Sequence, residues 1–207
     1  MPAQKAIPLF SVPLLGHIDY RTIKMFSSIL ALSLSLSSIA LAAPIADAGC
    51  DRAMLLDAAN QYLTAVTTGS TSAFTALDDN VAYTENWKAM APKSGLLGQA
   101  LKIDHNRTTA DTTQCATYTE IIVTDSKHPY VFGAQMRLAG NKVTTIDVIM
   151  TQKGDWAFNA ANTLKYATPE NWGEIPEAKR DSRDVIKAAG DAYCDLFNNK
   201  AAVVPWV

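Results

Sequence analysis

The chain has 207 residues, of which 18 are basic and 20 acidic, and 48% of its residues are hydrophobic. A formal net charge of -2 without clustered Lys and Arg argues against a nucleic-acid partner and against adhesion to anionic membranes. The length suits one ordinary domain with its own hydrophobic core.

Residues 25–42 have the pattern of a secretory signal peptide. The stretch 29–41 is apolar and diluted only by serines, and it closes on Ala40-Leu41-Ala42, the small-x-small pattern of a signal peptidase site. It is shorter than the roughly 20 residues that a membrane-spanning helix needs. We therefore predict a secreted, extracellular protein with no membrane segment after cleavage. The alternative is that this stretch forms a buried core helix.

The 24 residues before the signal show neither a helical nor a strand period. Two interpretations stay open. Residues 1–24 are either an extended positive region of the signal, with Arg21 and Lys24 as its charges, or the product of a start assigned upstream of Met25. Both interpretations exclude this extension from the fold.

Three cysteines follow the signal: Cys50, Cys115 and Cys194. An oxidising compartment favours one disulfide, and we predict Cys50–Cys115, which would tie the start of the first helix to a strand in the middle of the domain. We expect Cys194 to be a buried, inert thiol on an apolar helical face. The chain has a single N-glycosylation motif, at Asn106, and we predict a surface glycan there.

The first half of the mature chain begins with helical signals. Residues 51–68 repeat apolar side chains at helical spacing, Asp51 can cap the start and Gly69 can end it. A short second helix is expected over 70–78, with Phe74 inward. Residues 80–86 read as a strand, and an irregular stretch with apolar contacts follows over 96–103.

The second half indicates an antiparallel meander. Residues 114–124 are rich in β-branched side chains, and residues 130–138 and 143–151 alternate between apolar and polar. A loop rich in Asn, Pro and Trp then leads into a last helix over 182–199. Helices followed by a meander predict an α+β fold in which the N-terminal helices cover one face of a curved antiparallel sheet.

The last helix repeats the pattern of the first. Aligned without a gap, the matched positions are Arg52 with Arg183, Met54-Leu55 with Val185-Ile186, Ala58 with Ala189, Tyr62 with Tyr193, and Val66 with Phe197. The segment 169–207 is therefore either the opening of a truncated second copy of the domain 43–168, or a C-terminal helix docked on that single domain.

Several short motifs together resemble a known fold family. They are Cys50-Asp51-Arg52, Tyr83-Thr84-Glu85-Asn86, Ile103-Asp104-His105, Asp111 with the run 115–120, Gly154-Asp155-Trp156, and the run 170–183. With the order of elements they resemble the SnoaL-like, nuclear transport factor 2-like cone. More narrowly, they are similar to a family of fungal secreted proteins that contain a domain of unknown function. The resemblance implies the cone fold, and a second similar half beyond the Pro-Trp near Val207. It implies no activity.

A cone of this family often encloses an apolar pocket with a few polar groups, so the resemblance implies a small hydrophobic ligand. Asp104 and His105 are the candidate catalytic pair, because a carboxylate beside an imidazole can set its pKa for proton transfer. His105 can equally be a solvated loop residue. Candidate wall residues are Tyr83, Glu85, Glu120 and Asp147. For two of them a structural role competes: Glu85 can fix a turn, and Asp147 can face solvent.

Other chemistries lack their motifs. The sequence has no G-x-S-x-G, no H-E-x-x-H, no P-loop and no G-x-G-x-x-G. Only two histidines follow the signal, so we expect neither a metal site nor a cofactor. The sequence does not specify an oligomeric state.

Three functions remain. The first is a secreted protein with a pocket for a small hydrophobic molecule, in a ligand-binding or accessory role. The second is a cofactor-independent isomerase, cyclase or lyase acting on a hydrophobic metabolite. The third is a cell-wall or effector-type interaction protein that uses an exposed surface, which an interior filled by side chains would favour.

Overall fold

The computed structural model describes residues 50–205. The predicted signal peptide over 25–42 and the extension over 1–24 therefore lie outside the described residues. Within the described part, none of the helices combines the length and the apolar character that crossing a bilayer requires.

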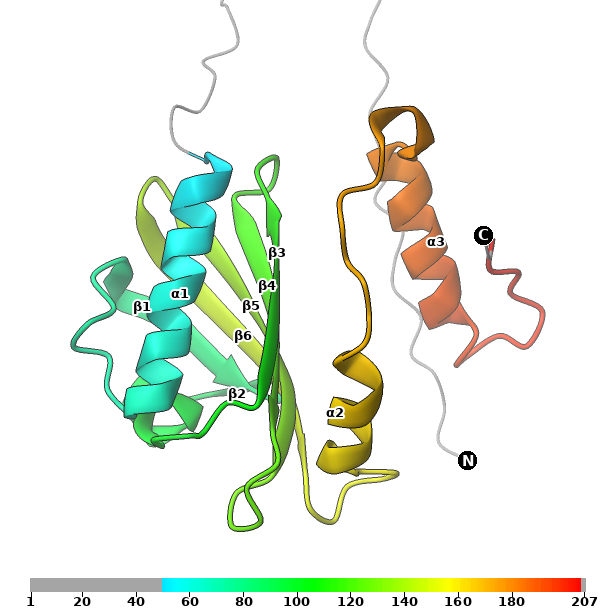
Figure 1. Cartoon of the computed structure of the whole chain (residues 1–207). Coiled ribbons are helices and arrows are strands. Elements are labelled where there is room, and N and C mark those ends of the chain that lie inside the picture. The colour runs from blue at the N-terminus through cyan, green and yellow to red at the C-terminus, as the bar shows by residue number, and fades with distance from the viewer. Residues whose placement is uncertain (1–49, 206–207) are drawn as a thin grey trace, which may run out of the picture. The chain divides into compact units, whose positions relative to one another are not determined.

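The described chain is an α+β domain built around one six-stranded sheet (Figure 1). In chain order its helices and strands are α1 (Arg52–Thr68), β1 (Leu77–Glu85), β2 (Lys88–Ala89), β3 (His105–Asp111), β4 (Ala116–Val123), β5 (Tyr130–Ala139), β6 (Lys142–Gln152), α2 (Ala160–Ala167) and α3 (Arg183–Asp195). The strands lie in the order β2-β1-β6-β5-β4-β3, so the sheet is open, with β2 and β3 at its edges.

The first helix forms where its sequence signals predict. Asp51 caps α1 by accepting a hydrogen bond from the backbone N–H of Met54 at 2.8 Å, and Gly69 ends it in the left-handed conformation at φ 65°. One face of α1 is buried: Leu55, Ala58, Ala59, Tyr62, Ala65 and Val66. That apolar face packs on the curved sheet (Figure 1), which confirms the predicted fold class.

Strand alternation divides the sheet into two faces. The inner face, toward α1, carries Ile121 and Val123 of β4, Phe132 and Met136 of β5, and Ile146 and Val148 of β6. The outer face carries the alternate residues, among them Tyr118, Glu120 and Ile122 of β4. Helix α2 packs against β4 and β5, and Ile122 is fully buried although it lies on the outer face.

Two parts of the first half differ from the predictions. Residues 70–76 form turns rather than a helix, because the Ser70 hydroxyl bonds to the backbone N–H and hydroxyl of Ser72 and competes with helical bonding. Phe74 is nevertheless buried as predicted. The stretch before β3 contains two short 3-10 turns, Pro92–Ser94 and Leu96–Gly98.

The sheet also differs from a simple meander. The strand β3 was not predicted, because its sequence HNRTTAD has no apolar alternation. The strand β1 pairs in parallel with β6, with Tyr83 opposite Ile146, so the sheet is mixed rather than wholly antiparallel. Every other pair of neighbouring strands is antiparallel.

The predicted disulfide is confirmed. Cys50 and Cys115 are bonded with their Cα atoms 5.3 Å apart, which joins the residue before the cap of α1 to the hairpin between β3 and β4. The expectation for Cys194 is wrong, because its thiol is free and exposed. The cause is its helix, since no residue of α3 is buried.

Candidate functional site

A small polar cluster lies inside the apolar core, between β1 and α1. Tyr83 and Glu85 come from the inner face of β1, and the Tyr83 hydroxyl donates a hydrogen bond to the Glu85 carboxylate. The backbone N–H of Leu96 donates to the same carboxylate oxygen at 2.5 Å. Glu85 is only 6% exposed and Tyr83 3%. A carboxylate this deeply buried is tolerated only because hydrogen bonds replace its hydration.

Gly95 is part of this arrangement. A Cβ atom at Gly95 would lie 2.1 Å from the Glu85 Oε1 atom, so only glycine leaves room for the carboxylate. The 3-10 turns of residues 92–98 are therefore built against Glu85. They also bring Leu96 and Leu97 into the core, where both are fully buried.

The hydroxyl of Tyr62 completes the cluster without a partner. Its oxygen is buried and makes no hydrogen bond among the described residues. Burial, and after it the negative charge of Glu85, raise the pKa of Tyr62 far above its ordinary value. Burial is also the main cause that raises the pKa of Tyr83. Both phenols consequently stay protonated and can act as hydrogen-bond donors. An unsatisfied buried hydroxyl costs about 1–3 kcal/mol of folding free energy.

Tyr62 and Tyr83 belong to the hydrophobic core of the domain. The same core includes Phe74, Leu96, Leu97, Phe132 and Met136, and the Phe74 ring lies edge-on to the Tyr62 ring with 6.3 Å between the ring centroids. All five are buried. Two buried hydroxyls are left without a hydrogen bond among the described residues, those of Tyr62 and Thr117, and the Tyr62 hydroxyl belongs to this cluster.

The candidate pair Asp104 and His105 has a different environment. The Asp104 carboxylate accepts hydrogen bonds from the Thr124 backbone N–H at 2.7 Å and from the Thr124 hydroxyl at 2.8 Å. These two bonds, the backbone one first, lower the pKa of Asp104. Asp104 thus ties the chain before β3 to the residue after β4. None of the hydrogen bonds described for residues 50–205 joins it to His105, which pairs with Ile122 on the outer face.

The other two wall candidates also lie on the outer face. Glu120 forms an ion pair with Arg107 of β3 at 2.7 Å, and Asp147 accepts a hydrogen bond from the Thr84 hydroxyl at 2.7 Å. Both side chains therefore lie on the face of the sheet opposite to the one that carries Tyr83 and Glu85. The structure therefore brings together Tyr83 and Glu85 but not the remaining candidates.

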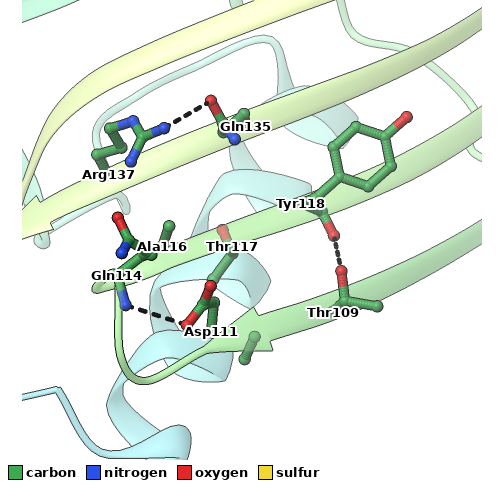
Figure 2. A pocket seen from close by; sticks show the side chains of 9 residues that line it. Thr109, Asp111, Gln114, Ala116, Thr117, Tyr118, Gln135 and Arg137 are labelled. Carbon is green, nitrogen blue, oxygen red and sulfur yellow. Dashed lines mark hydrogen bonds between the residues drawn. The ribbon is translucent and has the colours of Figure 1, made fainter. Parts of the chain in front are cut away.

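Figure 2 shows a groove on the outer face, across β3, β4 and β5. Its volume is about 250 Å³ and its lining includes Thr109, Asp111, Tyr118, Gln135 and Arg137. The Arg137 guanidinium donates to the Gln135 side-chain oxygen at 3.4 Å. This volume is below the range of about 300–1,000 Å³ that is usual for small-molecule sites. The groove can accept a side chain or a small polar group rather than a whole metabolite.

The segment after α2 reaches the outer face at two points. The Arg107 guanidinium stacks on the Trp172 ring, 3.8 Å from its centroid. Arg183, the first residue of α3, forms a two-fold hydrogen-bonded ion pair with Asp111 at the end of β3. The charged side chains of β3 are therefore paired with groups on this face.

Sequence reasoning missed Tyr62 and Gly95 as members of the interior cluster. Tyr62 occupies a core position of a helical period, and that period does not distinguish a phenol from an aliphatic side chain. Gly95 lies in a stretch without periodicity, where only its close approach to Glu85 reveals its role. No three His, Cys, Asp or Glu side chains gather as a metal site would need within residues 50–205.

Comparisons with known proteins found one family model and several solved structures that are similar to this chain. The family model described as a domain of unknown function (DUF8021) matches residues 179–207. No curated protein matches the sequence.

Similar solved structures are of low identity. An NTF2-like protein of unknown function from Burkholderia xenovorans LB400 has 14% identity and a TM-score of 0.41, over 62% of this chain and 99% of that one. An NTF2-like protein of unknown function from Cytophaga hutchinsonii ATCC 33406 has 10% identity and a TM-score of 0.38, over 47% and 89%. A putative ketosteroid isomerase from Kribbella flavida DSM 17836 has 13% identity and a TM-score of 0.35, over 63% and 95%.

Proposed function

We propose that this domain binds a small hydrophobic molecule that carries one hydrogen-bond acceptor, in the interior beside Tyr62, Tyr83 and Glu85. The observation that carries the proposal is the Tyr62 hydroxyl, which is buried without a partner. An acceptor on the ligand would receive this hydrogen bond, and the apolar part of the ligand would contact the surrounding core side chains.

Entry requires movement, because Tyr62, Tyr83 and Glu85 are almost wholly buried. The 3-10 turns of residues 92–98 are the part of the wall best suited to move. They contribute Leu96 and Leu97 to the core, and the Leu96 N–H bond to Glu85 holds them there. Displacement of these two leucines would open space next to the cluster, and the ligand would replace their apolar contacts.

A cofactor-independent isomerase, cyclase or lyase would add proton transfer to this binding. Such a reaction needs a proton acceptor beside the ligand. Glu85 is the carboxylate inside the core, whereas Asp104 is committed to Thr124 at the edge of the sheet. Binding alone is the simpler proposal, because Glu85 already accepts two hydrogen bonds.

The substitution Tyr62→Phe tests the proposal. It removes the unsatisfied hydroxyl and keeps the ring, so the free protein should gain about 1 kcal/mol or more of unfolding free energy. The same change should weaken binding of 2-tetralone, an apolar bicyclic ketone, measured by calorimetry. Tyr166→Phe is the matched control, because Tyr166 is exposed on α2. We expect no change in stability or affinity there.

Two results would overturn the proposal. One is a Tyr62→Phe variant that is less stable than the parent protein, since the hydroxyl would then have a stabilising partner. The other is affinity for 2-tetralone that is unchanged by Tyr62→Phe, or undetectable in the parent protein.

We also propose that the protein is exported, on the sequence pattern of residues 25–42. Expression of the full chain in a eukaryotic host with a secretory pathway tests this. Intact-mass spectrometry of the medium should show a chain that begins near Ala43. Retention of the uncleaved chain inside the cell would contradict it.

A second candidate is an interaction protein. The observation that favours it is the set of apolar side chains exposed on the C-terminal segment, among them Trp172, Ile175 and Ile186. The two candidates predict different outcomes for Leu97→Ala. Space made inside the core should increase 2-tetralone binding for an internal site and have no effect for a surface partner.

A further inference from the structure

We propose that Asn106 carries an N-linked glycan and that this glycan covers the free edge of β3. The inference rests on the proposed export, because N-glycans are added in the secretory pathway. The sequence motif identifies Asn106 as an acceptor, and the structure adds that Asn106 lies on the edge strand of the sheet.

The strand β3 is a long, open edge. It is the last strand in the order β2-β1-β6-β5-β4-β3 and pairs only with β4, so the backbone groups along its other side have no partner strand among the described residues. It has seven residues, whereas β2 at the opposite edge has only two. A long unpaired edge is a template for pairing with another chain.

The usual protective devices are weak on β3. Its sequence HNRTTAD contains neither Lys nor Pro. Its charged side chains, Arg107 and Asp111, are paired on the outer face with Glu120, Trp172 and Arg183. These charged side chains therefore do not lie along the free edge of β3, where they would repel an incoming strand. A bulky group attached to the strand itself would serve instead.

Asn106 is placed to carry that group. It is the second residue of β3 and is exposed, between the partly buried His105 and Arg107. The hydrogen bonds and ion pairs described for residues 50–205 include none from its side chain. Asn106-Arg107-Thr108 satisfies the acceptor motif, because the middle residue is not Pro.

The folded structure also restricts when transfer can occur. The Thr108 hydroxyl is 3.0 Å from the Thr119 hydroxyl of β4 and shares a hydrogen bond with it. The acceptor motif is therefore engaged once β3 has paired with β4, so transfer precedes this pairing. In the transfer, Asn106 Nδ2 loses a proton and bonds to the anomeric carbon of a lipid-linked oligosaccharide. The bond between that carbon and the lipid pyrophosphate breaks, and the pyrophosphate leaves.

The test uses the full chain secreted by a eukaryotic host, followed by peptide N-glycosidase and mass spectrometry of the peptide that contains Asn106. The enzyme should release a glycan and convert Asn106 to aspartate. Thr108→Ser keeps the acceptor motif and should keep the glycan, whereas Thr108→Ala and Asn106→Gln should lose it. Thr109→Ala is the neighbouring control that leaves the motif intact.

The edge function has its own readout. Secreted protein trimmed by endoglycosidase to the first sugar should form more dimers and larger species in size-exclusion chromatography than the untrimmed protein, with no change of sequence. Unchanged elution after trimming would overturn the edge-covering role. A secreted chain without a glycan at Asn106 would overturn the inference and leave export intact. A chain that is not exported would overturn both.

Discussion

Helices α1 and α3 have the same pattern and opposite environments. Each helix begins with a capping side chain that accepts a hydrogen bond from the backbone N–H three residues later. The capping residue is Asp51 in α1 and Ser182 in α3. Leu55 of α1 is fully buried, whereas Ile186, the matching residue of α3, is 62% exposed. The sheet beneath α1 accounts for this difference.

The comparison shows what helical periodicity can and cannot predict. It identified both helices and the side of each that is apolar. It did not identify the surface on which that side packs, and for α3 the described residues provide no buried contact. Arg183 of α3 still contacts Asp111 of β3, so the alternative of a C-terminal helix docked on the single domain stays a prediction. That residues 169–207 open a second copy of the domain stays a prediction.

The largest expected effect concerns the covalent tie of α1, which α3 lacks. Cys50→Ser removes a disulfide that closes a loop with a sequence separation of 65 residues. In the chain-entropy account this should cost about 4 kcal/mol of unfolding free energy. Denaturant unfolding measures it, with Cys194→Ser as the control because that thiol is free and exposed. Equal effects of the two substitutions would contradict the structure.

Truncation at matched positions tests the difference in burial. Leu55→Ala should destabilise the domain by about 2–5 kcal/mol, because it leaves a cavity under α1. Ile186→Ala should stay within about 0.5 kcal/mol, because its side chain is exposed. Both are measured by urea unfolding of the full chain. A large loss at Ile186 would mean that α3 packs on a surface that this conformation does not show.

A smaller effect is expected at the matched pair Ala59 and Gly190. Apart from its chain neighbours and the backbone of its own helix, a Cβ atom at Gly190 would meet no atom within 4 Å, so Gly190→Ala should favour the helix by about 0.5–1 kcal/mol. Helical circular dichroism and local hydrogen exchange of α3 would report it. Ala59→Gly, in the buried face of α1, should instead destabilise its helix. A destabilised Gly190→Ala variant would indicate a close neighbour at that position.

The smallest effect concerns the ion pair at the start of α3. Hydrogen bonding from Arg183 is the main cause that lowers the pKa of Asp111. Because the pKa of Asp111 is lowered in the folded protein, the ion pair contributes its full stabilisation above the ordinary carboxylate pKa of about 3.9. This stabilisation is lost as the pH falls through the lower pKa that Asp111 has in the folded protein. Acidification should therefore release α3 before the domain unfolds. Nuclear magnetic resonance of the Arg183 guanidinium would follow this release, and Asp111→Asn should abolish the transition.

Much of the fold could be predicted because its signals are local. The cap and end of α1, the alternation of β5 and β6, and the cysteine pair each follow from neighbouring residues or from a simple count. The strand β3 could not be predicted in this way, because an edge strand that faces solvent needs no apolar alternation. The parallel pairing of β1 with β6 is a long-range choice that no local pattern specifies.

The candidate site was predicted in part. Tyr83 and Glu85 are two residues apart on one strand, so they share a face, and the structure places both in the core. Asp104 and His105 are adjacent, and adjacency is a poor guide to contact because Asp104 bonds to Thr124 and His105 is on the outer face. To predict where Glu120 and Asp147 lie, one needs the register of the sheet, because the register fixes the face on which every strand residue lies.

The parallel pairing of β1 with β6 has a consequence for biosynthesis. A ribosome releases Leu77–Glu85 well before Lys142–Gln152, and β6 is the strand that joins β1 to the rest of the sheet. While β3, β4 and β5 can pair as they emerge, β1 has only the two-residue β2 beside it until β6 is complete. The nascent chain must therefore keep a nine-residue strand from pairing wrongly until the last strand has been synthesised.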